Sequence, residues 1–235
     1  MKIDAVILAA GAGQRMKMPG VPKALVTVGG KPMICYAIDA LHESGINNIF
    51  IVKYYSDEFD VVDSTYINTN VNLRYIEDYE RKGSLYSFSL VEKYVTRSFV
   101  CLDCDLFITP YSLKKMIGRG IKKLKDCALD GIVTVVKNPS KLDSNMLLIE
   151  NDLVVRFIKE GNPLCKRGGY VFLWNRTIFE SIDSFLREGC FSLSKYYDYF
   201  AQRHRIGTME IDDIWDIDNE YDLLFTNHHL RKANN

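Results

Sequence analysis

Residues 6–33 read VILAAGAGQRMKMPGVPKALVTVGGKPM. An apolar run ends in a glycine-rich turn at Gly11 and Gly13, Arg15 follows at once, and Lys23 comes eight residues later. Small residues let backbone N–H groups approach phosphate oxygens, and the two cations can neutralise the phosphate charge. The stretch therefore predicts a buried strand that leads into a triphosphate-binding turn.

Two better-known phosphate-binding loops do not fit this stretch. A P-loop requires G-x-x-x-x-G-K-[ST], which the chain lacks. The dinucleotide fingerprint requires a third small residue that opens a helix, and Met16 occupies that position. A strand followed by an ordinary basic surface loop would not require Arg15, Pro22-Lys23 and Gly30-Lys31-Pro32 at these spacings. We therefore expect a charged phosphate-binding turn of another kind.

Composition and charge limit the class of protein. A length of 235 residues suits one large α/β domain or two small ones. Acidic and basic residues balance at 30 each, so charge does not favour nucleic acid or an anionic membrane as partner. No apolar run approaches the ~18–20 residues that span a bilayer. The short apolar segment at 3–8 leads into the charged motif, so we interpret it as a strand and not as a signal peptide. We expect a cytoplasmic protein without membrane insertion.

The six cysteines do not form a metal-binding or disulfide pattern. Cys101 and Cys104 are spaced as C-x-x-C, but a zinc site needs a second closely spaced pair, which the sequence lacks. Both lie inside an apolar, strand-like run and not at a helix start. We expect structural thiols that pack as small buried hydrophobic side chains.

Strand and helix patterns alternate in the first half of the chain. Continuous apolar runs predict strands at 3–8, 48–54, 72–76 and 99–104, and helical periodicity predicts helices at 32–43 and 84–94. Such alternation predicts a doubly wound parallel sheet with right-handed crossovers.

The second half has closely spaced strands with polar turns between them. We expect strands at 131–136, 146–149, 153–157, 169–174 and 207–211, and helices at 178–186, 193–202 and 219–230. No linker, repeat or low-complexity tract divides the chain. We expect one domain over residues 1–235, with a nucleotide-binding first half and a second half that builds the wall for another substrate.

Two acidic segments could complete a phosphate site. Asp105 follows the strand at 99–104, and open parallel sheets bind ligands beyond the carboxyl ends of their strands. Alternation places Asp216 and Asp218 on one face of an extended segment. Magnesium needs one or two protein carboxylates besides phosphate oxygens and waters, so one from each segment would serve. Asp218 could equally cap a helix, and the two roles can coexist.

The chain resembles the sugar-phosphate nucleotidyltransferases, also called nucleoside-diphospho-sugar pyrophosphorylases. Residues 8–33 match the pattern L-A-A-G-x-G-x-R-M…P-K-A-L…V-x-G-K-P-M, and weaker matches lie at 82–87, 99–107, 155–159, 169–173 and 215–223. The resemblance implies an α/β fold with a Rossmann-like, mostly parallel mixed sheet, helices on both faces and a small antiparallel subsheet on the substrate side. It also implies that an NTP and a phosphorylated acceptor give an NMP-linked product and pyrophosphate.

The same resemblance assigns roles residue by residue. The nucleotide would be bound by Leu8, Ala9, Ala10, Gly11, Gly13, Lys82, Gly83, Ser84 and Asp103. Arg15 would stabilise the pyrophosphate leaving group, Lys23 the α-phosphate, and Lys159 the acceptor phosphate. Asp105, with Asp218 or Asp216, would bind Mg²⁺. The chain departs from the family pattern in three places: Cys104 replaces a small residue, no proline follows Lys159, and no glutamine heads the base-contact segment.

The resemblance also narrows the substrates. Guanylyl-transferring members have L-A-G-G at the glycine turn, so Ala10 favours a pyrimidine nucleotide or, less often, an adenine nucleotide. The segment 82–87 is most similar to small cytidylyltransferases that act on phosphocholine or inositol phosphate. We therefore expect CTP and a phosphorylated alcohol as substrates, with a homodimer possible. A UTP- or dTTP-dependent hexose-1-phosphate enzyme and a catalytically silent nucleotide-binding subunit are the alternatives. The aromatic stripe at 196–200 is expected to belong to the core more than to a cage around a quaternary ammonium.

Overall fold

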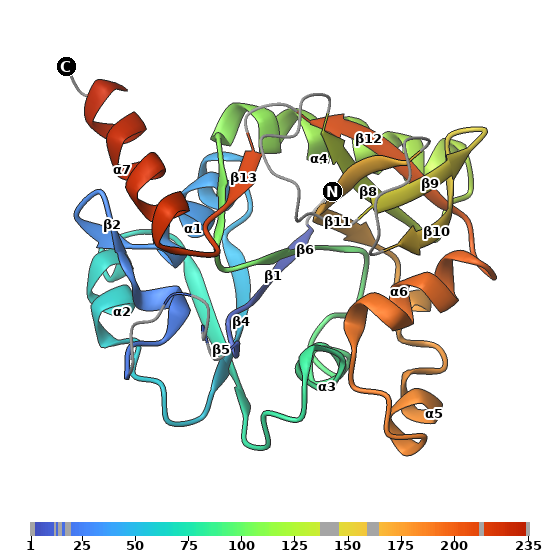
Figure 1. Ribbon diagram of the computed structural model, residues 1–235, viewed down its shortest axis with the longest axis horizontal. Helices are drawn as coiled ribbons and strands as arrows, with labels where there is room; N and C mark the ends of the chain where they lie inside the picture. Colours follow the sequence, from blue (N-terminus) through green and yellow to red (C-terminus); the bar gives the residue numbers. More distant parts are fainter. Residues whose placement is uncertain are drawn as a thin grey trace.

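The computed structural model describes residues 3–11, 13, 16, 20–136, 146–158, 165–211 and 214–233, and of residues 229 and 231–233 only the backbone. In this part of the chain nine strands form one sheet, in the order β5-β4-β1-β6-β11-β8-β12-β10-β9 (Figure 1). They are β1 (Asp4–Leu8), β4 (Asn48–Tyr54), β5 (Asn72–Asp78), β6 (Phe99–Asp103), β8 (Gly131–Val136), β9 (Met146–Glu150), β10 (Leu153–Ile158), β11 (Lys166–Trp174) and β12 (Ile206–Ile211).

The two halves of the sheet differ in strand direction. β5, β4, β1 and β6 run parallel. β11 lies antiparallel between β6 and β8, β12 is parallel to β8, and β10 and β9 follow antiparallel. β9 also pairs with β11, so the last five strands close on themselves. The predicted Rossmann-like mixed sheet is confirmed, and the predicted antiparallel strands continue this sheet.

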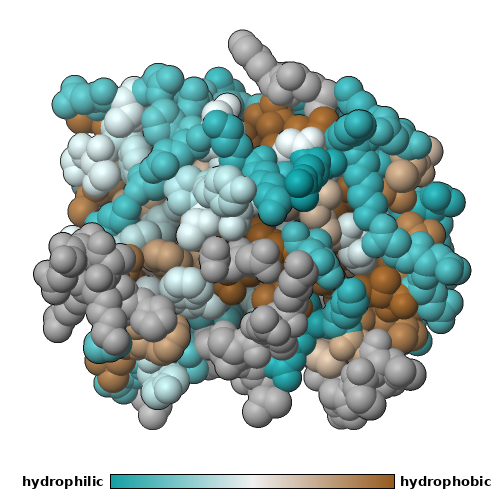
Figure 2. Space-filling model, turned by 90° about the horizontal axis from the view of Figure 1, so that it is seen from above, coloured by the Kyte–Doolittle hydropathy of each residue, from teal (hydrophilic) through white to brown (hydrophobic). Residues whose placement is uncertain are grey.

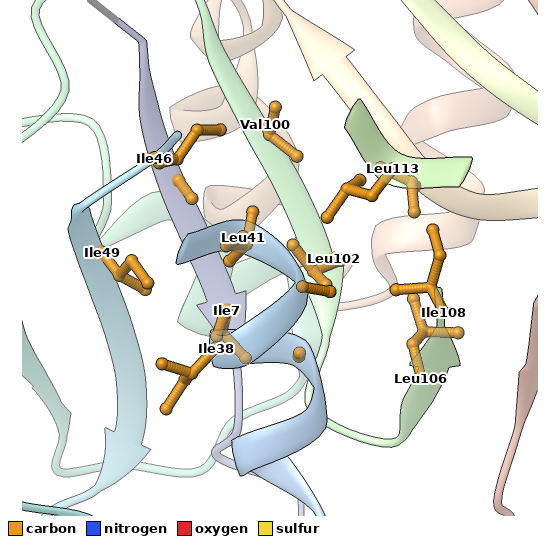
Figure 3. Close-up of a cluster of buried hydrophobic side chains, with 14 of the residues drawn as sticks. Ile7, Ile38, Leu41, Ile46, Ile49, Val100, Leu102, Leu106, Ile108 and Leu113 are labelled. Atoms are coloured by element: carbon orange, nitrogen blue, oxygen red, sulfur yellow. The ribbon is translucent and has the colours of Figure 1, made fainter. Parts of the chain in front are cut away.

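Helices cover both faces because the side chains of β1 alternate between two hydrophobic clusters. Ala5 and Ile7 pack with α1 (Ile34–Glu43), α2 (Asp60–Tyr66) and α4 (Pro110–Asp126). Figure 3 shows part of this cluster, with Ile38 and Leu41 of α1 beside Ile7. On the other face, Val6 belongs to the cluster formed with α3 (Ser84–Ser89), α5 (Ile182–Arg187) and α6 (Leu193–Ala201).

The structure adds elements that the sequence analysis did not predict and divides others. α4 begins with Thr109, whose hydroxyl accepts the Ser112 amide, and with Pro110 in its first turn. These are ordinary helix-start signals that could have been used. α2 was also not predicted. The helix expected at 178–186 is divided into η3 (Arg176–Phe179) and α5, because Ser181 adopts a left-handed conformation with φ 68°.

Beside the nine-stranded sheet, the described residues form two small sheets and a third hydrophobic cluster, and this cluster joins the amino-terminal motif to residues near the end of the chain. One small sheet pairs β2 (Thr27–Val28) with β3 (Lys31–Pro32), and the other pairs β7 (Leu106–Ile108) with β13 (Ile214–Asp216). The third hydrophobic cluster joins Met16, Val26, Val28 and Met33 to Ile217 and to Leu223 of α7 (Glu220–Ala233). Segments from opposite ends of the chain therefore share one core.

On the face shown in Figure 2, hydrophilic residues cover much of the coloured surface, and hydrophobic residues form separate patches. Among the described residues no helix is long and apolar enough to cross a membrane. All six cysteines are free thiols, and Cys101 and Cys104 are buried as predicted.

A stability test follows from the pairing of β8 with β11. Gly131 lies opposite Trp174, and a Cβ at Gly131 would overlap the fully buried indole ring. We expect Gly131→Ala to lower the free energy of unfolding by about 1–3 kcal/mol through overpacking. Gly118 lies exposed in α4 with open space around it, so Gly118→Ala should raise stability by up to about 1 kcal/mol. Urea unfolding of both variants measures this, and equal effects would contradict the packing argument.

Candidate active site

A cleft of about 650 Å³ opens at the carboxyl edge of the parallel strands, where open α/β sheets bind ligands. Segments that follow β1, β5 and β6 line it, together with parts of β11, α6 and the turn before α7. Its wall includes Leu8, Ala10, Gly11, Gly13, Lys23, Arg81, Gly83, Ser84, Ser87, Asp103, Asp105, Gly169, Phe172, Tyr197 and Asp218.

The glycine turn packs directly on the lysine of the same motif. Gly13 has φ +62°, and a Cβ there would lie 2.9 Å from Cβ of Lys23. A side chain at this position would therefore be strained and would displace the lysine. η2 (Lys23–Leu25) starts at Lys23, which is only 9% exposed. The spacing of Gly13 and Lys23 in the motif therefore allows this close contact.

Lys23 joins two carboxylates that are far apart in the sequence. Its Nζ forms ion pairs with Asp105 and, at 2.6 Å, with Oδ1 of Asp218. Burial by itself lowers the pKa of Lys23, but the attraction of the two carboxylates outweighs burial and raises it above its ordinary value. The ammonium is therefore held charged in the cleft.

The pairing of β7 with β13 brings the two carboxylates together. The Ile217 amide donates to the Asp105 carbonyl at 3.0 Å, one residue beyond the β7–β13 ladder. The start of α7 is capped by Asn219, whose Oδ1 accepts the Asp222 amide, while Asp222 accepts the Asn219 amide. Asp218 is thus not the helix cap that the sequence allowed, and its carboxylate contacts Lys23.

Asp216 and Asp218 differ in what they contact. Asp216 pairs with Leu106 at the end of β13, and it is not part of the cleft wall. Asp218 lines the cleft and contacts Lys23 beside Asp105. The geometry therefore favours Asp218 as the partner of Asp105.

Three carboxylates, those of Asp103, Asp105 and Asp218, share this part of the cleft with the single ammonium of Lys23, so a further cation would be attracted there. Asp103 opens onto the cleft at the end of β6. Burial first, and the carboxylates of Asp105 and Asp218 second, raise the pKa of Asp103 to about 7, against the attraction of Lys23. No group of three or more potential ligands is preformed among the described residues. Two carboxylates beside a phosphate site are nevertheless a donor set that fits Mg²⁺, which takes its other ligands from phosphate and water.

The other end of the cleft is built by the loop that follows β5. Asp78 is fully buried, and its Oδ1 accepts the amides of Glu80 and Arg81 at 3.0 and 2.8 Å. Its Oδ2 accepts the Ser87 hydroxyl at 2.6 Å. The carboxylate therefore fixes the loop against the first turn of α3. The sequence analysis did not identify Asp78 or Arg81, and it included Ser87 only as part of the segment 82–87 that resembles the family.

Most predicted nucleotide-binding residues lie on the cleft wall: Leu8, Ala10, Gly11, Gly13, Gly83, Ser84 and Asp103. Gly83 has φ 144°, and a Cβ there would lie 2.7 Å from the Phe191 carbonyl, so the close contact of this loop with the second half requires glycine. Two predicted residues differ. The Ala9 amide donates to the Val52 carbonyl at 2.7 Å, and the exposed Lys82 ammonium pairs with Glu80; neither residue lines the cleft.

The far wall of the cleft is aromatic. Phe172 and Tyr197 line the cleft with ring centroids 4.7 Å apart, and both also contact Trp174. Tyr196 and Phe200 are fully buried, so the aromatic stripe is mainly core, as predicted.

The predicted catalytic residues Arg15 and Lys159 lie outside the described residues.

The fold and the cleft together define an α/β protein of the nucleotidyltransferase type, with a glycine turn that packs on a lysine at the carboxyl edge of its sheet. A model of the MobA-like NTP transferase domain matches residues 5–193. The chain belongs to this family.

Individual relatives agree with the family assignment. The chain is 39% identical over 109 residues to a choline-phosphate cytidylyltransferase of Streptococcus pneumoniae. The aligned segment covers 45% of this chain and 46% of that protein. The chain spans about half the length of the curated relatives it matches.

Solved structures share the fold. The inositol-1-phosphate CTP transferase from T. maritima superposes with a TM-score of 0.80 at 19% identity, over 94% of this chain and 92% of that one. A UDP-glucose pyrophosphorylase from Acinetobacter baumannii has a TM-score of 0.79 at 16% identity, over 97% and 93%. At these identities the likeness concerns the fold alone.

A stability prediction concerns the buried carboxylate of Asp78. We expect Asp78→Ala to lower the free energy of unfolding by about 3 kcal/mol, at about 1 kcal/mol for each of its three lost hydrogen bonds. Amide exchange at Glu80 and Arg81 should become faster. Asp126→Ala, at the exposed end of α4, should change stability by less than about 0.5 kcal/mol. Unchanged exchange in the loop would show that Asp78 does not order it.

Proposed function

We propose that this protein transfers a nucleoside monophosphate from an NTP, with CTP favoured, to a phosphorylated small molecule and releases pyrophosphate. The observation that carries the proposal is the Lys23 ammonium, held between Asp105 and Asp218 beside the Gly11–Gly13 turn. A cation and two carboxylates at the edge of a glycine turn match the needs of a triphosphate with its metal.

The proposed chemistry follows from charge. Two polyanions have to meet, so their repulsion is the first barrier, and an acceptor phosphate is already a nucleophile at neutral pH. The site must therefore position both groups and neutralise developing charge more than it must move protons. We assign Lys23 to the α-phosphate, Arg15 to the pyrophosphate and Lys159 to the acceptor phosphate. Mg²⁺ bound by Asp105 and Asp218 would neutralise phosphate oxygens.

The acceptor class is supported by the relatives and by the far wall. Relatives of this chain include choline-phosphate cytidylyltransferases, and one structural neighbour is an inositol-1-phosphate CTP transferase. The aromatic wall at Phe172 and Tyr197 suits an acceptor with a compact, weakly hydrated part. A phosphorylated alcohol is therefore the favoured acceptor.

A UTP- or dTTP-dependent hexose-1-phosphate enzyme is the second candidate. It is supported by structural neighbours that include a UDP-glucose pyrophosphorylase and a putative glucose-1-phosphate thymidylyltransferase. A silent nucleotide-binding subunit would be expected to lack part of the charged set, whereas Lys23, Asp105 and Asp218 are brought together.

The proposal is tested by magnesium-dependent pyrophosphate release with each NTP against a panel of acceptors. The panel contains phosphocholine, inositol 1-phosphate, glycerol 3-phosphate, glucose 1-phosphate and N-acetylglucosamine 1-phosphate. We expect turnover with CTP and a phosphorylated alcohol. Turnover with hexose 1-phosphates alone would establish the second candidate, and nucleotide binding without any turnover would favour the silent subunit.

Replacing the lysine should separate catalysis from folding. We expect Lys23→Met to lower the turnover rate by about 10²–10³-fold, as for the loss of one preorganised group at a reacting centre. Without the ammonium, Asp105 and Asp218 repel each other, so Mg²⁺ should raise the melting temperature of this variant more than that of the wild type. Lys123→Met removes a lysine that pairs with Asp152 outside the cleft. This control should change neither the turnover rate nor the effect of Mg²⁺ on the melting temperature. A normal turnover rate for the folded Lys23→Met variant would show that Lys23 is not needed at the reacting centre.

The metal assignment is tested by three matched substitutions. We expect Asp105→Asn and Asp218→Asn each to raise the Mg²⁺ concentration needed for half-maximal turnover by at least about tenfold, since each removes one of two anionic ligands. Asp216→Asn should leave that concentration unchanged. A shift for Asp216→Asn with none for Asp218→Asn would reverse the assignment.

A further inference from the structure

Arg81 occupies a position on the cleft wall that the proposed chemistry does not use. The loop carrying it follows β5, whereas Lys23, Asp105 and Asp218 lie beside and beyond β6. The sheet order β5-β4-β1-β6 places the glycine turn after β1 between these two regions. A nucleotide whose phosphates lie at Lys23 and cross the glycine turn therefore extends its base toward Arg81.

The guanidinium of Arg81 is held in one orientation by three contacts. Its Nε donates to the Ala10 carbonyl at 3.2 Å, and its Cζ lies 4.0 Å from the centroid of the Tyr54 ring. Its Nη2 is 3.7 Å from Oδ2 of Asp57. The backbone is fixed as well, because the Arg81 amide donates to Asp78 in a left-handed conformation with φ 47°.

This conformation is unusual for arginine and is maintained by the loop. A residue with a side chain is rarely found at positive φ, and asparagine or glycine would adopt it at lower cost. The chain nevertheless has arginine there, stacked on an aromatic ring and adjacent to the glycine turn. The side chain is 36% exposed, so it remains accessible from the cleft.

The hydrogen-bonding character of this end of the cleft is defined by two groups. A guanidinium only donates hydrogen bonds, through five N–H groups in a planar fork, and the Ala10 carbonyl only accepts them, with one lone pair remaining beyond Arg81. Hydrogen-bond donors and an acceptor therefore lie next to each other at this end of the cleft.

We propose that Arg81 and the Ala10 carbonyl together select cytosine, with the guanidinium donating to O2 and N3 and the carbonyl accepting from the 4-amino group. Uracil presents N3–H and O4 at the same places, so a donor would meet a donor and an acceptor an acceptor. Guanine has the same conflict at N1–H and O6. Adenine, with N1 as acceptor and N6 as donor, matches in part but has no O2. The inference rests on the proposed function, because it names the base of the nucleotide that this site would bind.

The test uses calorimetric binding of Mg·CTP, Mg·UTP and Mg·pyrophosphate to the full chain without acceptor. We expect the wild type to bind CTP about tenfold or more tighter than UTP, as for a bidentate base contact. Arg81→Met should weaken CTP binding about tenfold, leave UTP within about twofold and bring the ratio near one. Arg81→Lys, which still only donates, should keep a reduced preference for CTP.

Two controls separate base recognition from other roles. Pyrophosphate should bind the wild type and Arg81→Met equally, because it has no base. Arg74→Met, which removes an exposed arginine stacked on Phe50 outside the cleft, should change no affinity. Melting temperatures confirm that each variant is folded.

The outcomes are distinct. Equal weakening of CTP, UTP and pyrophosphate in Arg81→Met would mean that the arginine binds phosphate, and an unchanged CTP/UTP ratio would mean that it does not read the base. Either result overturns the inference and leaves the proposed function in place. Failure of the wild type to bind any NTP would overturn the proposed function and this inference with it.

Discussion

The ion pairs of one lysine with two aspartates determine how the rest of the structure is arranged. Lys23 is almost fully buried, and burial alone would disfavour its charge. Asp105 and Asp218 make that charge favourable, but each aspartate would itself be costly at the bottom of a cleft without a cation. The three side chains are therefore stable only together, and the fold has to bring three separate segments to one point.

Several modest features accomplish this. The β7–β13 pair aligns the turn after β6 with the segment before α7, and the hydrogen bond from Ile217 to Asp105 extends that alignment. The third hydrophobic cluster joins the same segment to the residues around Lys23. Because Asn219 and Asp222 cap α7, the carboxylate of Asp218 is directed to the lysine. Each of these contacts is modest by itself, and each helps to hold one of the three segments in position.

The two ends of the cleft are built on different physical principles. At the β6 end, charged side chains gather beside the glycine turn, and electrostatics dominate. At the β5 end, a buried carboxylate organises a loop through backbone amides, so shape and hydrogen-bond direction dominate. The glycine turn after β1 lies between them and is common to both. Reaction chemistry and substrate selection can thus reside in separate segments of one cleft.

The sequence by itself determined the alternating strands and helices of the first half, the glycine turn and the lysine that follows it. These depend on local patterns: apolar runs make buried strands, and small residues make close turns. It also determined that Asp105 closely follows a buried strand, which is β6 in the structure. Helix α4 was equally readable from Thr109 and Pro110, and its omission reflects an unused local signal.

Only the tertiary structure decided which carboxylates and which arginine face the cleft. Asp216 and Asp218 cannot be distinguished by spacing, because their difference depends on where β13 ends and how α7 is capped. Arg81 carries no local signature, since its orientation depends on Ala10, Tyr54 and Asp57 from other segments. Contacts between distant segments have no periodicity in the sequence, and so the fold alone could place these side chains.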